Sequence, residues 1–231
     1  MRSEPILLVH GFASSFEQNW REPGWVDLLQ EAGRQVIPLD LPGHGRADKP
    51  HDPAAYANLS SAVEDALPAA GSGPIDAIGF SLGAQLLLDV ASRQPERFGR
   101  LVVGGVGANV FSSNDPEPVA LAIERGDAGA EDPSVARAFA QFASGPGVDR
   151  AALAACLRGS RRRVTAEDLA GLTRPVLVVL GDRDFAGPAD PLVDALPDAK
   201  LVTLRGADHF GTPKDFRFLD AALEFLDAVP G

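Results

Sequence analysis

The chain contains very little cysteine, since Cys156 is the only one in 231 residues. A single cysteine cannot close an internal disulfide, so folds that depend on disulfide staples are excluded. Cys156 has no catalytic partner beside it in the sequence, and we expect it to be a small packed side chain. Long apolar runs are also missing, because none approaches the ~18 residues that a membrane-spanning helix needs. The N-terminus has no signal-peptide pattern either, so we expect a cytoplasmic protein.

Basic residues are scarce relative to acidic ones. Lysine and arginine total 21 against 32 aspartates and glutamates, which gives a formal net charge of −11. Because phosphate backbones and anionic lipids are bound by lysine and arginine, this balance argues against nucleic-acid and membrane partners. The chain lacks the phosphate loop G-x-x-x-x-G-K-[ST], and His10 and His44 have no metal-ligand spacing, so we expect no metal and no cofactor. Arginine far exceeds lysine and alanine is abundant, which is typical of a GC-rich bacterial genome.

Short apolar runs and longer helical segments alternate through most of the chain. The runs are continuous and rich in Val, Ile and Leu, which is typical of strands buried on both faces of a sheet. We predict strands at Pro5–Val9, Gln35–Leu39, Ile75–Phe80, Leu101–Val103, Val176–Leu180 and Leu201–Leu204. We predict helices at Trp25–Ala32, Leu59–Leu67, Leu82–Gln94, Asp190–Leu196 and Phe216–Ala228. This alternation predicts an α/β fold with a mostly parallel sheet of about six strands flanked by helices.

One segment interrupts the alternation. No convincing strand occurs between residues 107 and 172, where we expect short helices at Val119–Arg125, Ser134–Ala143 and Asp149–Arg158, and a further one capped by Thr165. We interpret residues 107–172 as a helical cap inserted into a core of residues 1–106 and 173–231. A long helical crossover is the alternative.

A small basic cluster, Arg158 and Arg161–Arg163, lies within this segment. We interpret it as a solvated helix end that pairs with nearby acidic residues. An anion-binding site is the alternative.

The strongest chemical signal is Gly79-Phe80-Ser81-Leu82-Gly83, a G-x-S-x-G motif between a predicted strand and a predicted helix. A serine at such a sharp turn needs a strained backbone, and the flanking glycines relieve the crowding there. The turn exposes the serine Oγ at a helix N-terminus, where free N–H groups favour developing negative charge. This position, more than the motif alone, predicts that Ser81 is a nucleophile.

A serine nucleophile needs a base, and the chain offers four histidines. His209 follows the last predicted strand, where a loop at the carboxyl edge of a parallel sheet can return to Ser81. His10 and His44 fit tight turns near the pocket, and His51, in a proline-rich stretch, fits the surface. His209 is therefore the predicted base.

The base needs an orienting carboxylate, and Gly181-Asp182-Arg183-Asp184 offers two. We favour Asp184 because it lies further into the loop, and we expect Asp182 to support the turn or to pair with an arginine. The order Ser81, Asp184, His209 is that of a nucleophile-elbow hydrolase. The oxyanion also needs N–H donors, which we expect from Leu82 and from Phe12 in the loop after the first strand.

Together these motifs resemble the α/β-hydrolase superfamily, particularly its small members with a helical lid. The motifs that carry the resemblance occur in the family's order over residues 8–209: Leu8-Val9-His10-Gly11-Phe12, Asp40-Leu41-Pro42-Gly43-His44-Gly45, Gly79-Phe80-Ser81-Leu82-Gly83, Gly181-Asp182-Arg183-Asp184 and Gly206-Ala207-Asp208-His209. The resemblance implies that Ser81 is the nucleophile, His209 the general base and acid, and Asp184 its partner. It also implies an oxyanion hole at Phe12 and Leu82, and a cap that lines the substrate pocket.

The chain departs from that family at its start. Members usually begin with two antiparallel strands, which we expect to be missing here, so that Gln35–Leu39 lies at an uncovered edge. An uncovered edge can pair with another chain, so a monomer and a homodimer both stay open. Relatives that open epoxides or displace halide carry Asp where Ser81 stands, which disfavours those activities.

The leading hypothesis is hydrolysis of an apolar small-molecule carboxylic ester, lactone or thioester through an acyl-enzyme on Ser81. Carbon–carbon bond hydrolysis on the same triad is one alternative. A small-molecule receptor on a hydrolase scaffold is the other. Seven phenylalanines indicate either an apolar pocket or plain core: Phe12, Phe80, Phe111, Phe139, Phe142, Phe185 and Phe210.

Overall fold

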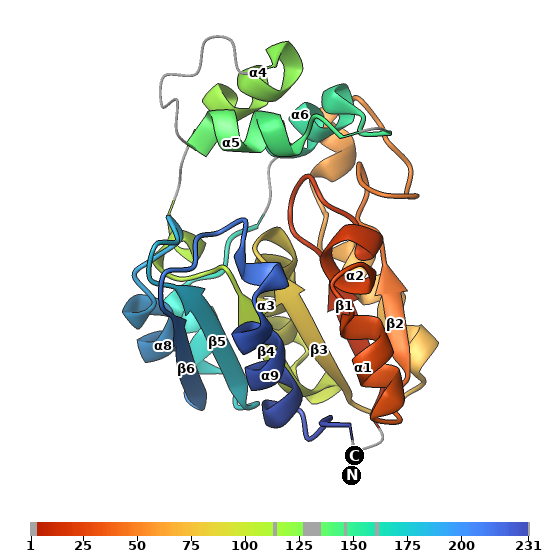
Figure 1. Cartoon of the computed structure of the whole chain (residues 1–231), viewed down its shortest axis with the longest axis vertical. Helices are drawn as coiled ribbons and strands as arrows, with labels where there is room; N and C mark the ends of the chain where they lie inside the picture. Colours follow the sequence, from red (N-terminus) through yellow and green to blue (C-terminus); the bar gives the residue numbers. More distant parts are fainter. Residues whose placement is uncertain (1–3, 113–114, 127–134, 146, 160–161, 231) are drawn as a thin grey trace.

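The computed structural model describes residues 4–112, 115–126, 135–145, 147–159 and 162–230. Its centre is a six-stranded sheet in the order β2-β1-β3-β4-β5-β6, in which each neighbouring pair is parallel (Figure 1). The strands are β1 (Ile6–Val9), β2 (Val36–Leu39), β3 (Ile75–Phe80), β4 (Phe98–Gly104), β5 (Val176–Gly181) and β6 (Ala199–Leu204). The predicted α/β class and strand number are confirmed.

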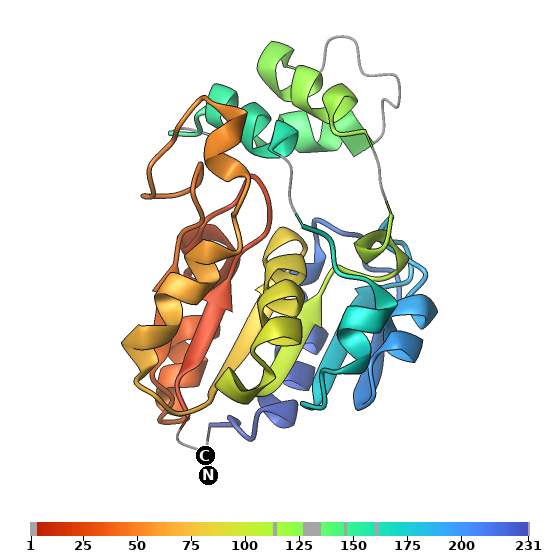
Figure 2. The same cartoon turned by 180° about the vertical axis from the view of Figure 1, so that it is seen from behind.

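Helices cover both faces of the sheet (Figures 1 and 2). In β1, Ile6 and Leu8 pack towards α1 and α9, whereas Leu7 and Val9 pack towards α2 and α3, together with α7 and α8. The bounds are α1 (Trp25–Glu31), α2 (Ser61–Ala66), α3 (Leu82–Arg93), α7 (Ala166–Ala170), α8 (Asp190–Ala195) and α9 (Phe216–Phe225). Burial on both faces explains the continuous apolar runs of the inner strands.

Short helical turns complete the connections between these elements. A π-helical segment at Glu17–Arg21 follows β1. Single 3-10 turns lie at Pro53–Tyr56, Leu67–Ala70, Pro95–Arg97, Ala108–Val110 and Thr212–Lys214.

The two edge strands differ from the inner ones. β2 lies at one edge, as expected from Pro38. β6 forms the other edge, and its Leu201 is 40% exposed. The expectation that every strand is buried on both faces is therefore wrong for β2 and β6, in which Pro38 and Leu201 are exposed because the helices cover the faces less completely at the edges of the sheet.

Three further helices lie over the carboxyl edge of the sheet: α4 (Glu117–Arg125), α5 (Val135–Phe142) and α6 (Arg150–Arg158) (Figures 1 and 2). Cys156 is fully buried in α6, as expected. α7 instead packs beside α3 and α8, and Thr165 and Asp168 form its capping box. Ser134, the predicted first residue of the second of these helices, lies outside the described residues.

Within the described segments, no helix combines the length and the apolar composition that crossing a bilayer requires. The division into a core of residues 1–106 and 173–231 and a cap of residues 107–172 stays a prediction.

Candidate active site

Ser81 lies at a strained turn between β3 and α3. Its backbone has φ +50° and ψ −112°, a conformation that a residue with a side chain rarely adopts. Two flanking glycines leave room for the turn. A Cβ on Gly79 would stand 2.8 Å from the backbone of Ala84, and one on Gly83 would overlap the carbonyl oxygen of Val9. The serine N–H donates to the Gly104 carbonyl at 2.8 Å, which fixes the turn on β4.

Ser81, Asp184 and His209 come together from the loops after β3, β5 and β6. His209 Nε2 lies 2.9 Å from Ser81 Oγ, and His209 Nδ1 lies 2.9 Å from both carboxylate oxygens of Asp184. Asp184 and His209 are both buried. Because an ionised carboxylate only accepts hydrogen bonds, Nδ1 carries the proton and Nε2 can accept the serine proton.

Hydrogen bonds between loops hold the histidine in place. Asp182 Oδ1 accepts from the Gly206 N–H at 2.7 Å, so Asp182 supports the turn as expected. Asp208 Oδ1 accepts from the Gly211 N–H at 2.8 Å. The first bond ties the loop after β5 to the loop after β6, and the second fixes the turn of the loop after β6 around His209.

The predicted oxyanion donors lie on the loop after β1 and at the start of α3. Among the described residues, the N–H groups of Phe12 and Leu82 have no hydrogen-bond acceptor. For Leu82 this follows from its place at the first position of α3, where no preceding turn supplies a carbonyl. Both groups are therefore available to a developing oxyanion.

Asn19 adds a positioning residue that no sequence motif indicated. Its buried side chain accepts from the Gly11 N–H at 2.9 Å and so fixes the His10–Gly11 peptide, which precedes the peptide that carries the Phe12 N–H. Asn19 reaches this position through the π-helical segment at Glu17–Arg21, for which the sequence offers no recognisable motif.

The other histidines hold turns or lie at the surface. His10 is buried, donates from Nδ1 to the Gly11 carbonyl at 2.8 Å and accepts at Nε2 from the Leu41 N–H at 3.0 Å. Burial lowers the pKa of His10, in keeping with this neutral form. His44 bonds the Pro42 carbonyl, and the exposed His51 lies 2.9 Å from Asp149. The parts of the chain that are described hold no cluster of His, Cys, Asp or Glu suited to a metal ion.

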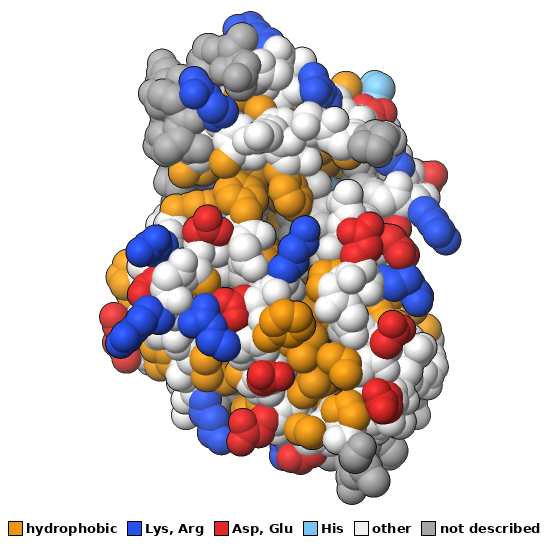
Figure 3. All heavy atoms as spheres, viewed as in Figure 1, with side chains coloured by type: hydrophobic (Ala, Val, Ile, Leu, Met, Phe, Trp, Pro, Cys, Tyr) orange, Lys and Arg blue, Asp and Glu red, His pale blue; other side chains and the backbone are white. Residues whose placement is uncertain are grey.

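Aromatic rings close one side of Ser81. Phe139 of α5 lies at their centre, with its ring 5.2 Å from that of Phe210, 5.8 Å from Phe12 and 6.0 Å from Phe185. The space left between Ser81, His209 and the rings of Phe12, Phe139 and Phe210 is only about 20 Å³. Hydrophobic side chains gather at this boundary between α5 and the core (Figure 3). We call this side the aromatic slot.

A much larger cavity of about 660 Å³ lies along α3, between the core and the helices above it. One face of α3 lines it with Leu82, Gln85, Leu86 and Asp89, beginning beside Ser81. Other apolar walls come from Val110, Phe111, Leu157 and Val164. Of the seven phenylalanines, Phe111 therefore belongs to this α3 cavity and not to the slot.

Two of the arginines at the rim of the α3 cavity, Arg158 and Arg162, pair with acidic residues, as predicted for this basic cluster. Arg158 bonds Glu117 at 2.7 Å and Glu124 at 2.6 Å, and its guanidinium lowers the pKa of both carboxyls. Arg162 pairs with Asp89 and Asp168. Arg163 donates to the Ser112 carbonyl at 2.6 Å, and Arg161 lies outside the described residues.

Three comparisons place the chain among known proteins. A family model described as "Alpha/beta hydrolase family" matches residues 6–228. The monoacylglycerol lipase of Mycolicibacterium smegmatis is 29% identical over 249 aligned positions, covering 96% of this chain and 87% of that protein. The 2-hydroxy-6-oxononadienedioate/2-hydroxy-6-oxononatrienedioate hydrolase of Escherichia coli is 31% identical over 125 residues, 50% of this chain and 40% of that protein. The crystal structure of a bromoperoxidase from Bacillus anthracis superposes with a TM-score of 0.76 at 20% identity, covering 98% and 92% of the two chains.

The chain spans about half the length, or less, of several curated relatives that it matches, from 31% to 58%. The activities of those longer proteins therefore do not carry over as a whole.

Proposed function

Since the chain belongs to the alpha/beta hydrolase family, as its motifs predicted, we propose that this hydrolase cleaves carboxylic esters through an acyl-enzyme on Ser81. The observation that carries the proposal is the pair of 2.9 Å contacts from His209, one to Ser81 and one to Asp184. They supply what a serine needs to attack a carbonyl, a base oriented by a buried carboxylate.

In this mechanism His209 Nε2 takes the proton from Ser81 Oγ as the oxygen bonds to the ester carbonyl carbon. The carbonyl oxygen becomes an oxyanion that accepts hydrogen bonds from the N–H groups of Phe12 and Leu82. His209 then gives its proton to the departing alcohol oxygen, which leaves the acyl group on Ser81. A water molecule repeats the sequence, releasing the acid and restoring the serine.

Carbon–carbon bond hydrolysis is the second candidate, because the relative from Escherichia coli is named for it. The substrate in that name is a dioate, which carries two carboxylates. Here Arg158 and Arg162 at the cavity rim already have two carboxylate partners each. Arg163, which also lines the cavity, donates to the Ser112 carbonyl. Because the guanidiniums of Arg158 and Arg162 are already neutralised, they offer a dianion less attraction than unpaired arginines would, which favours uncharged esters.

We further propose that residues 107–172 form the cap of this enzyme. Its α5 supplies Phe139 to the aromatic slot, and its α6 supplies Leu157 to the α3 cavity. Both substrate-facing spaces thus depend on the same inserted segment.

Steady-state hydrolysis of p-nitrophenyl esters tests the proposal. We expect multiple turnovers by the parent and a fall of ~10⁴-fold or more in Ser81→Ala, because the loss of the nucleophile removes the covalent route. Ser144→Ala, which changes an exposed serine at the end of α5, is the matched control and should keep the parental rate. Mass spectrometry of a rapidly quenched reaction should detect the acyl group on Ser81.

The alternatives give different results in the same assays. Turnover of a diketone-like substrate without any ester turnover would favour the carbon–carbon hydrolase. A folded protein that reacts once with an ester and then stops would favour a receptor.

A further inference from the structure

We propose that the ion pair between Asp89 and Arg162 is the far wall of the substrate cavity and limits the length of the acyl chain that the enzyme accepts. This inference rests on the proposed ester hydrolysis at Ser81. It assigns a specificity-determining role to two residues that lie outside the triad and the oxyanion hole.

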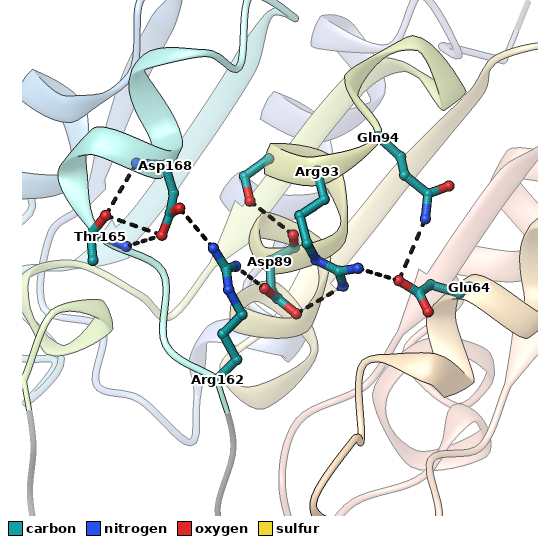
Figure 4. A network of polar contacts seen from close by, with 8 residues as sticks. Glu64, Asp89, Arg93, Gln94, Arg162, Thr165 and Asp168 are labelled. Carbon is teal, nitrogen blue, oxygen red and sulfur yellow. Dashed lines mark hydrogen bonds and ion pairs between the residues drawn. The ribbon is translucent and has the colours of Figure 1, made fainter.

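The pair joins two parts of the fold (Figure 4). Asp89 belongs to α3, whereas Arg162 lies on the segment that leads back from α6 to α7. The Asp89 side chain is only 5% exposed and is held by Ser60, by Arg93 at 3.1 Å and by Arg162. Arg162 also reaches Asp168 at 2.7 Å, so its guanidinium is fixed from two sides.

The carboxylate of the wall stays ionised at neutral pH. Burial alone would raise the pKa of Asp89, but hydrogen bonds from Ser60, Arg162 and Arg93 outweigh it and lower that pKa. A buried carboxylate with several charged donors is costly to displace, so the wall resists an entering apolar chain.

Asp89 and Arg162 also line a second cavity, of about 200 Å³. Its other walls include Ser60, Glu64 and Arg93, none of which borders the α3 cavity. The ion pair therefore stands between two spaces, and removing the Arg162 side chain would connect them.

The distance along α3 from Leu82 to the far wall sets the maximum length of the acyl chain. Leu82 and Asp89 are seven residues apart, which corresponds to about 10 Å along a helix that rises 1.5 Å per residue. An extended chain advances roughly 1.2 Å per bond, since one peptide unit of three bonds spans about 3.5 Å. About eight chain atoms therefore fit between the oxyanion donor at Leu82 and the ion pair.

The charges of the far wall also determine which group is accepted at the distal end of the acyl chain. Arg162 is neutralised by Asp89 and Asp168, so it offers little attraction to an added carboxylate. Leu86, Val110 and Leu157 cover the space before it with apolar surface. The acyl group that fits is a medium-length, uncharged one.

The test compares chain-length profiles with p-nitrophenyl esters from butanoate to hexadecanoate. For the parent we expect the highest kcat/KM near eight carbons and a fall of about tenfold or more by twelve, because extra methylenes have no room. In Arg162→Ala the optimum should move to longer esters. Arg93→Ala is the matched control, because it removes another partner of Asp89 but borders only the second cavity. An unchanged profile in Arg162→Ala, or an equal shift in Arg93→Ala, would overturn the proposal.

A second variant tests the path of the chain without touching the ion pair. Leu86 lies halfway along the cavity face of α3, so Leu86→Phe should lower kcat/KM for octanoate while butanoate is still cleaved. Equal losses for both esters would contradict the assignment, whether or not Arg162→Ala folds.

A binding measurement distinguishes an incorrect assignment of the far wall from an incorrect proposal of ester hydrolysis. Calorimetry with 1-alkanols of increasing length needs no chemistry and uses Ser81→Ala with and without Arg162→Ala. We expect the longest alkanol that binds to increase when Arg162 is truncated. The same length limit in both proteins, or no binding to either, overturns the wall. Absence of ester turnover by the parent, with the shift in length limit present, overturns only the ester assignment.

Discussion

The two sides of Ser81 are built on different physical principles. The aromatic slot is filled by rings from α5 and from the core loops, and leaves about 20 Å³. The α3 cavity leaves about 660 Å³ and ends at the ion pair between the buried Asp89 and Arg162. Aromatic rings close space by packing, and their shape does not depend on pH. An ion pair closes space by hydrogen bonds of fixed direction, and it depends on the ionisation of a carboxylate. We therefore expect the slot to exclude bulky groups under all conditions and the α3 cavity to measure chain length.

If the aromatic slot and the α3 cavity serve one triad, a variant that disables the triad should affect every substrate. Asp184→Asn is that variant and has the largest expected effect. An asparagine would favour the wrong histidine tautomer, so we expect kcat to fall by ~10⁴-fold for every ester, short or long. Steady-state kinetics on butanoate and octanoate esters would check this. Asp220→Asn, which changes an exposed carboxylate on α9, is the control and should keep the parental kcat. A loss confined to one chain length would contradict a shared triad.

Asn19→Ala tests whether the oxyanion loop between the two sides is held in position. Without the Asn19 acceptor the Gly11 N–H loses its bond, and the Phe12 N–H can leave its place. We expect kcat to fall by about 10²-fold with little change in KM, since the oxyanion forms only in the transition state. Gln18→Ala, exposed on the same π-helical segment, should behave as the parent. A rise in KM at constant kcat would instead indicate a role in substrate binding.

The sequence predicted the sheet well, because its strands depend on short-range patterns. Continuous apolar runs bounded by turns marked the six strands, and β3 was predicted with the bounds it has, Ile75–Phe80. Ser81, Asp184 and His209 could then be located, because parallel strands end at one edge and their loops meet there.

What the sequence could not predict are contacts between distant side chains. Asp89 and Arg162 are 73 residues apart, and their pairing depends on how the segment after α6 returns to α3. Asn19 meets Gly11 through a π-helical segment that no local pattern announces. Phe139 was one of seven candidate pocket residues, and only the packing of α5 distinguishes it from Phe111. Helical periodicity gives the face of a helix but not the partner that this face meets.

Phe139→Ala tests the aromatic slot independently of the α3 cavity. Removing the central ring enlarges the slot without touching the ion pair, so kcat/KM for naphthyl acetate relative to phenyl acetate should rise about tenfold. The preference for acyl chain length should stay that of the parent. Phe216→Ala, which truncates a ring that is 75% exposed, is the control and should change neither ratio. A shift in the acyl-length optimum of Phe139→Ala would show that the two sides are not independent.

The smallest expected effect concerns stability and distinguishes the two sides by pH. Because hydrogen bonds depress the pKa of Asp89 below its unfolded value of about 3.9, the bonds of its carboxylate contribute full stability above that pH. The contribution is lost as the pH falls through the folded pKa. Asp89→Asn should therefore lower the free energy of unfolding by about 1 kcal/mol near neutral pH, and by progressively less below about pH 4.

Urea unfolding of the parent, Asp89→Asn and Phe139→Ala at several pH values would measure this contrast. The carboxyls of Glu64 and Asp168 belong to the same network, but they are common to all three proteins, so the difference between the parent and Asp89→Asn isolates the contribution of Asp89. The loss in Phe139→Ala comes from ring packing and should be the same at every pH. A constant difference for Asp89→Asn down to about pH 3 would mean that the pKa of Asp89 is the same in the folded and the unfolded protein, so that the hydrogen bonds of the far wall do not favour its ionised form.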